Sequence, residues 1–574
     1  MTKKINNNRR QFLQNSAFGA AALTAFPGVL FAQSSPLRTK ATPGFKADVE
    51  IEFISRDVYV PVLKTGRETK VQKYYAKLLK GPKKTLVELK GNYLGPIINY
   101  VKGQKVRIYY KNMMSEPSII HWHGLHVPQD SDGHPMYTLE TGQSHIYEFE
   151  VMNNAGTSFY HSHSHNLTAE QVYKGLAGLI TVTDDEEQKL DLPRGEYDLP
   201  FVIQDRTFDE QNQLKYLHGM HGRMTGFLGE SILVNGLPNV EFSVKSRAYR
   251  FRAVNGSNSR IYKLGWDDGT PLTAIGTDAH LLPKPETRPY LMLAPGERID
   301  LWLDFSGRPV GSELVMYSLP YAGAMPPKME EQRLGKKSSG GGMGMGGGMM
   351  GMMSPSVGQG DKFAIATFKV TKKVSDSPKL PKTLGRFERL TERDVDNKHK
   401  PIPIGISMKP MRPMLNGKSF SMNRVLDFEK VELGSIKKIK IFHDHGPMKM
   451  KEGEKMDKDM DMSDGKMKME GGGGMGMMGG GMGGGMMMSM AHPIHLHGQQ
   501  FQILSREIEG MRQEEYKTVK DGFLDTGWKD TVLVMPGEEI VVAKPFQDYK
   551  GLFLYHCHNL EHEDLGMMRQ FYIS

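Results

Sequence analysis

The sequence predicts an all-β protein built from sandwich domains, and two observations carry this prediction. Short runs in which apolar and polar residues alternate, such as 105–110, 249–254 and 300–305, predict half-buried antiparallel strands, because successive side chains of a strand point to opposite faces. The second observation is that one short phrase recurs along the chain. No long stretch shows a convincing helical period, and 574 residues correspond to three or four domains of about 150 residues each.

The recurring phrase is a glycine turn followed by a polar residue and then an alternating strand. It occurs at residues 102–104, 141–143, 295–297, 433–435 and 536–538. Repetition of such a phrase over the whole length predicts duplicated sandwich domains.

Composition narrows the class of protein. The chain is 39% hydrophobic and 24% charged, as expected for a packed protein rather than a disordered one. It has 40 Met but a single Cys, which excludes an internal disulfide framework and a zinc ribbon. The net charge of +9 is spread among acidic neighbours, so we expect no nucleic-acid partner. No run of 18 apolar residues occurs, so we expect no stable membrane insertion.

The first 33 residues predict an export signal. Arg9-Arg10-Gln11-Phe12-Leu13 precedes a mildly apolar run from 17 to 32, and this layout resembles the bacterial twin-arginine signal. We therefore expect residues 1–33 to be a signal peptide and the mature protein to be periplasmic.

Two segments interrupt the strand pattern. Residues 338–360 are nearly all Gly, Met and Ser, and residues 447–490 are a Met-studded insert that ends in Gly-Met runs. Ordering so much glycine in a sheet would cost too much conformational entropy, so both are expected to be flexible loops.

Half of the 20 histidines fall into four tight clusters, at 121–123, 161–163, 492–497 and 556–562, and each cluster contains one His-x-His pair. In a strand, residues i and i+2 share a face, so each His-x-His pair presents two imidazoles side by side. Four pairs, two towards each end of the chain, could surround a metal cluster if the end domains meet. The pairs are His121 and His123, His161 and His163, His495 and His497, and His556 and His558.

The single cysteine indicates which metal. In a strand, Cys557 points away from its neighbours His556 and His558, so it could bind one metal while they bind another. A thiolate, two imidazoles and a weak thioether define a blue-copper electron-transfer site, whereas zinc has no redox role. Candidates for the other ligands are His492, His562 and Met567.

From about residue 45 to its end, the chain resembles the multicopper oxidases, and among them the periplasmic copper-efflux (cuprous) oxidases. The motifs that carry the resemblance are the His-x-His pairs and the segment from His556 to Met568. The resemblance implies three cupredoxin-like Greek-key β-sandwich domains, at 45–190, 195–375 and 400–574. The Met/Gly-rich segments would be flexible insertions, with the loop 338–360 in the second domain and the insert 447–490 in the third.

The resemblance also implies four copper ions and their ligands. The type 1 copper would be held by His492, Cys557, His562 and Met567. The type 2 copper would take His121 and His495. The type 3 pair would take His123, His161, His163, His497, His556 and His558. Asp132 and Glu563 match acidic positions that the family uses in proton supply, although each could be an ordinary carboxylate that orients a ligand.

The methionines of the second insert indicate which reductant the enzyme oxidises. Thioether sulfur suits Cu(I) better than Cu(II), and the insert ends two residues before His492. Met486, Met487, Met488 and Met490 are therefore candidate ligands of a substrate Cu(I). The cuprous oxidases typically have an acidic residue at the position of Met488, so this substrate site is expected to be rebuilt. The segment His443-Asp444-His445 could join it or could be a surface pair.

We therefore predict a monomeric enzyme that oxidises Cu(I) and reduces O₂ to water in copper tolerance. A laccase acting on phenols or a ferroxidase is the alternative within the same chemistry. Two alternatives are not enzymes: a periplasmic copper-buffering protein, and a copper-free scaffold of the same fold that acts in cell division. A nitrite reductase is disfavoured, because that family has two domains per chain and lacks the full set of histidines.

Overall fold

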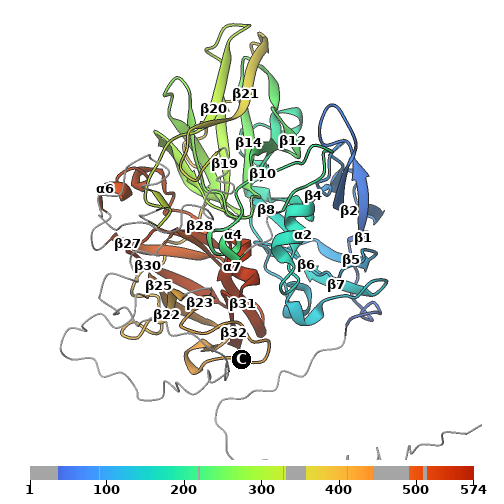
Figure 1. Cartoon of the computed structure of the whole chain (residues 1–574), viewed down its shortest axis with the longest axis vertical. Helices are drawn as coiled ribbons and strands as arrows, with labels where there is room; N and C mark the ends of the chain where they lie inside the picture. The colour runs from blue at the N-terminus through green and yellow to red at the C-terminus, as the bar shows by residue number, and fades with distance from the viewer. Residues whose placement is uncertain are drawn as a thin grey trace, which may run out of the picture.

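The computed structural model describes residues 37–89, 91–216, 220–326, 329–330, 357–409, 412–444, 490–508 and 513–574. The predicted export signal, residues 338–356 of the first Met/Gly-rich segment and residues 447–489 of the second lie outside this set. The described chain forms six β-sheets that fall into three pairs, each pair drawn from one stretch of sequence. Figure 1 shows the second pair, in green, above the first pair, in blue to cyan, and the third, in orange to red. The all-β prediction is confirmed.

The first pair of sheets lies between residues 49 and 183. Its four-stranded sheet has the order β2-β1-β5-β7 and its five-stranded sheet the order β3-β4-β9-β8-β6. The strands are β1 Val49–Val60, β2 Thr69–Lys80, β3 Leu86–Val87, β4 Ile97–Val101, β5 Lys105–Asn112, β6 Ile120–His121, β7 Ser144–Glu150, β8 Gly156–Ser162 and β9 Ala177–Thr183.

The second pair lies between residues 198 and 372. Its sheets have the orders β12-β11-β10-β14-β19-β16-β17 and β13-β21-β20-β15-β18. The strands are β10 Asp198–Arg206, β11 Ser231–Val234, β12 Leu237–Pro238, β13 Glu241–Lys245, β14 Ala248–Asn255, β15 Tyr262–Trp266, β16 Leu272–Thr277, β17 His280–Arg288, β18 Leu291–Leu293, β19 Arg298–Asp304, β20 Glu313–Ser318 and β21 Phe363–Lys372.

The third pair lies between residues 402 and 573. Its sheets have the orders β23-β22-β25-β30-β27-β28 and β24-β32-β31-β26-β29. The strands are β22 Ile402–Lys409, β23 Arg412–Leu415, β24 Lys430–Val431, β25 Ser435–His443, β26 His492–Leu496, β27 Phe501–Ile508, β28 Trp528–Lys529, β29 Thr531–Val534, β30 Glu538–Phe546, β31 Gly551–Cys557 and β32 Met568–Ile573.

Short helices connect the strands. The α-helices of the described chain are α2 Thr168–Lys174, α3 Asp185–Gln188, α4 Met220–Thr225, α6 Gln513–Tyr516 and α7 Leu560–Asp564. None of these helices is long and apolar enough to cross a membrane.

The turns before the strands explain the recurring glycine phrase. Gly103, Gly142, Gly296, Gly434 and Gly537 all have a φ between 81° and 89°, in the left-handed region. Glycine has no Cβ and enters this region at little cost. The strands β5, β7, β19, β25 and β30 begin one or two residues later. The repeated phrase therefore marks a turn conformation that starts equivalent strands in all three pairs of sheets.

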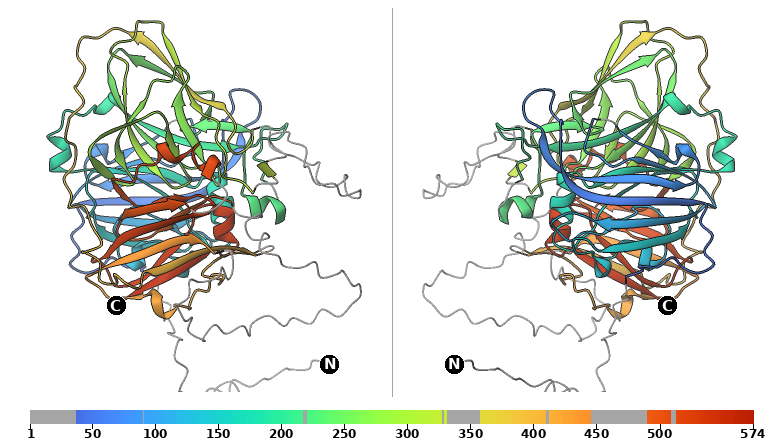
Figure 2. Two further views of the ribbon diagram at one scale, coloured as in Figure 1. Left: turned by 90° about the vertical axis from the view of Figure 1, so that its left-hand side faces the viewer. Right: turned by 90° about the vertical axis from the view of Figure 1, so that its right-hand side faces the viewer.

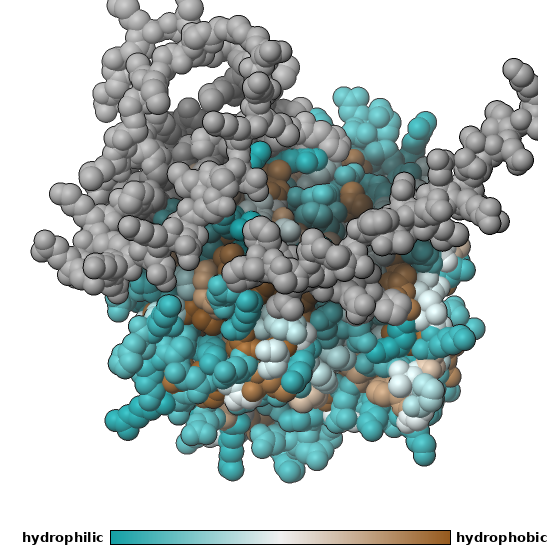
Figure 3. Space-filling view, turned by 90° about the horizontal axis from the view of Figure 1, so that it is seen from below, coloured by the Kyte–Doolittle hydropathy of each residue, from teal (hydrophilic) through white to brown (hydrophobic). Residues whose placement is uncertain are grey.

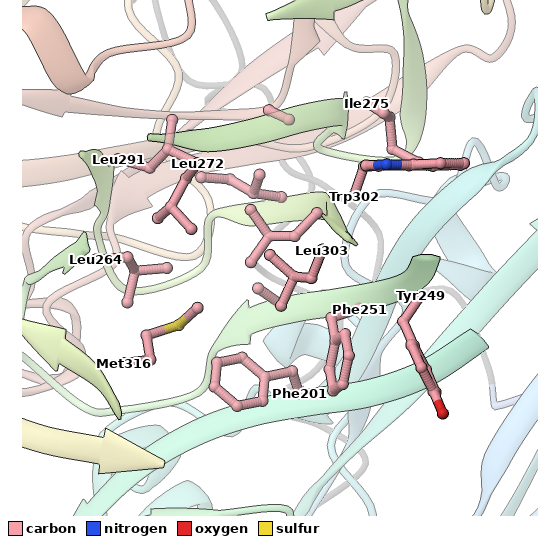
Figure 4. Close-up of a cluster of buried hydrophobic side chains, with 14 of the residues drawn as sticks. Phe201, Tyr249, Phe251, Leu264, Leu272, Ile275, Leu291, Trp302, Leu303 and Met316 are labelled. Atoms are coloured by element: carbon pink, nitrogen blue, oxygen red, sulfur yellow. The ribbon is translucent and has the colours of Figure 1, made fainter. Parts of the chain in front are cut away.

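Each pair of sheets encloses its own hydrophobic core. The core of the second pair is shown in Figure 4, where Phe201, Phe251, Leu264 and Leu303 point towards one another from different strands. Burying an apolar side chain of this size contributes about 1.5–3 kcal/mol. Separate clusters include Trp122 in the first pair and Ile494 and Cys557 in the third.

Smaller apolar clusters join the three pairs. Phe159 packs with Val202 between the first and second pairs, and Met292 packs with Leu533 between the second and third. The first and third pairs meet where Val172 of α2 packs on Leu560 of α7. The turned views in Figure 2 also keep the green sheets above the other two pairs. These contacts bring the two ends of the sequence together.

The outer surface is predominantly polar where it can be seen. Figure 3 views the molecule from below, and hydrophilic side chains cover most of the coloured part of this face, with hydrophobic side chains in patches between them. This agrees with the charged fraction of 24%.

Candidate metal centres

The clustered histidines lie on neighbouring strands at the contact between the first and third pairs of sheets. In the first pair, His121 on β6 is directly opposite His161 on β8. In the third, His495 on β26 is directly opposite His556 on β31. Strand pairing therefore puts two His-x-His pairs side by side within the first pair of sheets and two within the third.

Contact between the first and third pairs of sheets brings their histidines into one cluster. His121 Nε2 lies 3.4 Å from His495 Nε2, and His163 Nε2 lies 3.3 Å from His556 Nε2. Within each unit, His123 Nδ1 is 3.4 Å from His161 Nε2, and His497 Nε2 is 3.1 Å from His556 Nε2. The ring of His558 lies 5.0 Å from that of His123 and 5.3 Å from that of His161, measured between centroids. All eight predicted cluster histidines are thus gathered and buried.

This arrangement fits bound metal. Both ring nitrogens of His558 and Nδ1 of His163 are buried without a hydrogen-bond partner within the described part of the chain. Burial lowers the pKa of His161 to about 4 and that of His163 to about 3, so these imidazoles are neutral and keep lone pairs available for a cation. Three groups of cluster histidines place their ligand atoms within 4.8 Å of one another: His121, His123 and His161; His121, His495 and His497; and His163, His497 and His556.

A second, smaller centre contains the cysteine. The Sγ atom of Cys557 lies 3.4 Å from Nδ1 of His492 and 3.8 Å from Nδ1 of His562. Met567 is fully buried, and its carbonyl accepts a hydrogen bond of 3.0 Å from the backbone N–H of Cys557. We call His492, Cys557 and His562 the triad. A thiolate with two imidazoles suits copper, and Met567 stands next to this set.

The two centres are joined through the backbone of β31 and the residue that follows it. Cys557 belongs to the triad, while its neighbours His556 and His558 belong to the cluster. The alternation of side chains along the strand, which the sequence predicted, is what separates them.

Comparison with known proteins agrees with this geometry. The family model described as multicopper oxidase matches residues 70–187 and again residues 482–574. These two stretches contain all of the cluster and triad residues. The chain belongs to the multicopper oxidase family.

Similar proteins include oxidases and one protein of a different class. The chain is 28% identical to a laccase of Bacillus subtilis over 79% of each protein. It is 35% identical to the cell division protein FtsP of Escherichia coli, over 41% of this chain and 50% of that protein. The crystal structure of the McoA multicopper oxidase from Aquifex aeolicus superposes with a TM-score of 0.68 at 27% identity, covering 92% of this chain and 97% of that one. The predicted cupredoxin-like fold is confirmed, and membership of the family implies an oxidoreductase with copper cofactors, O₂ and a reducing substrate.

The two acidic residues predicted from the resemblance to multicopper oxidases lie beside the cluster and differ in charge state. Asp132 Oδ2 is 2.7 Å from Nδ1 of His497, and Glu563 Oε2 is 3.0 Å from Nδ1 of His556. Burial raises the pKa of Asp132 well above its usual range. Burial alone would raise the pKa of Glu563 as well, but its interactions with His556 and His163 lower it instead. One carboxyl therefore holds a proton more readily than the other.

A third carboxylate beside the cluster was missed by the sequence analysis. Asp530 Oδ1 lies 3.0 Å from Nε2 of His123, and the Asp530 carbonyl lies 2.9 Å from Nδ1 of His495. The guanidinium of Arg298, from the second pair of sheets, donates to both carboxylate oxygens of Asp530 at 2.6 and 2.5 Å. Burial opposes ionisation, but Arg298 and His123 keep the pKa of Asp530 well below its usual range. Nothing in the spacing of Asp530 signals this role, because all three pairs of sheets contribute to the contact.

Two further groups lie beside the imidazoles of the triad. The carbonyl of Met224, in α4, lies 3.0 Å from Nε2 of His562. The ring of His443, at the end of β25, lies 5.6 Å from that of His492 between centroids. No pattern in the sequence indicates that α4 lies beside the triad, and the spacing of His443 leaves its role open.

The remaining predicted residues have simpler positions. Met490 is described and buried, whereas Met486, Met487, Met488 and His445 lie outside the described residues. Four histidines outside the two centres form hydrogen bonds in the fold: His126 with Gln500, His134 with Gln570, His145 with Asp130 and His280 with Asn154. His399 is exposed, and the ring of His165 contacts that of Phe420.

Proposed function

We propose that this multicopper oxidase couples the one-electron oxidation of Cu(I) to the four-electron reduction of O₂ to water, in the periplasm and in the service of copper tolerance. Four Cu(I), one O₂ and four protons give four Cu(II) and two waters. The single observation that carries the oxidase activity is the shared segment at Cys557, which belongs to the triad while His556 and His558 belong to the cluster.

Four coppers fit the side chains present. His492, Cys557, His562 and Met567 would hold a type 1 copper, His121 and His495 a type 2 copper, and the other six cluster histidines a type 3 pair. When bound, these coppers supply the stepwise electron acceptance and the reduction of O₂.

The protein contributes a fixed and buried environment. The cluster imidazoles are held by strand pairing, and Asp530 and Arg298 fix the orientation of His123. Asp132 and Glu563 stand at hydrogen-bond distance from ligand imidazoles, where one can hold a proton and the other can accept one. Both are buried beside the cluster, so we expect them to pass protons to it.

The preference for Cu(I) rests on where the Met-rich insert joins the fold. It leaves after β25, whose last residue His443 contacts the ring of His492, and it returns at Met490, two residues before His492. The insert therefore joins the fold beside the triad at both of its ends. Its methionines carry thioethers, which favour Cu(I) over Cu(II).

The second candidate is a laccase-like oxidation of phenols or of Fe(II), which the similarity to the Bacillus subtilis laccase supports. A copper-buffering protein or a copper-free scaffold in cell division is less well supported, since neither function requires ten buried ligand histidines and Cys557 converging on two centres.

Oxygen uptake by the copper-loaded protein tests the proposal. Cu(I) in a stabilising chelator, Fe(II) and a simple phenol are compared side by side, with the Cys557→Ser variant correcting for the reaction of free Cu(I) with O₂. We expect the fastest uptake with Cu(I), at one O₂ per four Cu(I). Uptake with the phenol or Fe(II) but not with Cu(I) would favour the second candidate. No uptake with any reductant would leave a binding protein or a scaffold.

A further inference from the structure

The two imidazoles of the triad have different surroundings. Both turn Nδ1 towards Cys557, so Nε2 is the atom that faces away from the sulfur. Nε2 of His562 lies 3.0 Å from the Met224 carbonyl and is thereby covered by backbone. Nε2 of His492 is buried and has no hydrogen-bond partner in the described ranges. Of the two imidazoles, His492 is therefore the one left open to something other than this chain's backbone.

His443 is the side chain that lies beside His492. It is 6% exposed, and its ring centroid is 5.6 Å from that of His492 with the planes inclined by 51°. His443 is the last residue of β25 and pairs in register with Ile406 of β22, while the next N–H, of Asp444, donates to the Ile406 carbonyl at 2.7 Å. The position of this imidazole is thus fixed by a sheet and not by a loop.

We infer that His443 is a ligand of the substrate Cu(I) and holds it against the outer side of His492. This inference rests on the proposed function and deepens it. Imidazole nitrogen suits copper, and Met490, buried two residues before His492, is positioned in the chain to supply a thioether as the second donor.

The electron balance is simple. Substrate Cu(I) bound at His443 gives up one electron through the adjacent imidazole of His492 and leaves as Cu(II). Cu(II) prefers harder donors than a thioether, so the product is released more readily than the substrate. O₂ is the terminal oxidant, as in the proposed function, and no other co-reactant is required.

A silver titration tests this site without relying on turnover. Ag(I) has the charge and soft character of Cu(I) but is not oxidised by the enzyme. Ag(I) is added to the oxidised, copper-loaded full chain while the blue absorption, expected at about 600 nm, is recorded. We expect a saturable change in this band, because Ag(I) at His443 lies next to a type 1 ligand. In His443→Phe the midpoint should move to at least tenfold higher Ag(I), and His443→Met, which keeps a soft donor, should restore most of the affinity.

The matched control is His399→Phe, the same substitution at an exposed histidine, and it should titrate as the wild type does. The same midpoint in wild type and His443→Phe would overturn the inference. Loss of the blue band in both His443 variants before silver is added would also overturn it, by showing that His443 only supports the triad.

The Michaelis constant for Cu(I) separates this inference from the proposed function. If wild type takes up O₂ with Cu(I) and His443→Phe raises the KM for Cu(I) at least tenfold, both stand. If wild type takes up O₂ with Cu(I) and the KM is unchanged, His443 is not a substrate ligand although the proposed function holds. If wild type takes up none with Cu(I) while silver still depends on His443, the metal site stands and the proposed function fails.

Discussion

The triad and the histidine cluster differ in how far apart in the sequence their members lie. All triad residues come from between residues 492 and 562, on one sheet and the short helix α7 that follows it. The cluster joins His121 to His495 and His163 to His556, pairs that are separated by 374 and 393 residues. The triad is therefore a property of the third pair of sheets, whereas the cluster exists only where the first and third pairs meet.

Their supporting groups differ in the same way. The cluster is surrounded by the carboxylates of Asp132, Asp530 and Glu563, each at hydrogen-bond distance from an imidazole. The triad is bordered instead by the backbone carbonyl of Met224 and by the ring of His443. Carboxylates at hydrogen-bond distance from ligand imidazoles suit a site that has to handle protons, whereas the groups that border the triad imidazoles are a backbone carbonyl and an aromatic ring.

The largest expected effect comes from cutting the link between the two centres. In Cys557→Ser the triad loses its thiolate while every cluster histidine remains. We expect the blue absorption and all O₂ uptake to disappear and the bound copper to fall from about four to about three per chain, since only the type 1 ion depends on the sulfur. Metal analysis with absorption spectroscopy and oxygen uptake measures this. Retained Cu(I) oxidation would show that electrons reach the cluster by another route.

A change at Asp530 should weaken the cluster alone. Asp530→Asn keeps the shape but removes the negative charge that pairs with Arg298 and orients His123. Loss of such a supporting carboxylate typically costs 10–100-fold in metal affinity, so we expect roughly that loss for cluster copper. Copper retention during dialysis against a chelator, compared with the blue absorption, measures it. Asp427→Asn, at a side chain that is 93% exposed, is the control. Equal loss of type 1 copper would contradict the separation of the two centres.

The pH dependence of copper affinity should also differ between the triad and the cluster. Burial raises the pKa of the Cys557 thiol, so copper has to displace a proton there at every pH below that raised value. Burial lowers the pKa of His161 to about 4 and of His163 to about 3, so these imidazoles are already unprotonated above about pH 5. From pH 8 to 5 we therefore expect copper affinity to fall about tenfold per unit at the triad and less steeply at the cluster.

Competition titrations of the metal-free protein against a chelator at several pH values measure this difference. A parallel fall at both centres would mean that the imidazoles are protonated in the same range as the thiol.

The smallest expected effect concerns the surroundings of the triad. Deleting residues 447–488 should lower Cu(I) oxidation several-fold and spare or increase the oxidation of a bulky organic dye, because the thioethers that select Cu(I) are removed while the triad and the cluster remain. Steady-state rates with the two reductants measure it. An equal loss of both activities would instead assign the insert a structural role.

Part of this molecule could be predicted locally. The strands around 105–110, 249–254 and 300–305 were predicted from alternation and are present as β5, β14 and β19. The His-x-His pairs were expected to present two imidazoles each, and strand pairing of His121 with His161 and of His495 with His556 does so. The supporting groups Asp530, Arg298 and Met224 were missed, because each reaches its partner from a different sheet or from a helix with no distinctive pattern.

The sequence by itself determined the class of fold, the pairing of imidazoles on one face and the placement of Cys557 between two histidines. All of these follow from the two-residue period of a strand, which is a local property. Only the tertiary structure decided that the pairs meet as one cluster, that Asp530 and Arg298 hold it, and that His443 stands beside His492. These contacts join residues from different sheets, and their positions are set by the packing of whole units rather than by any pattern along the chain.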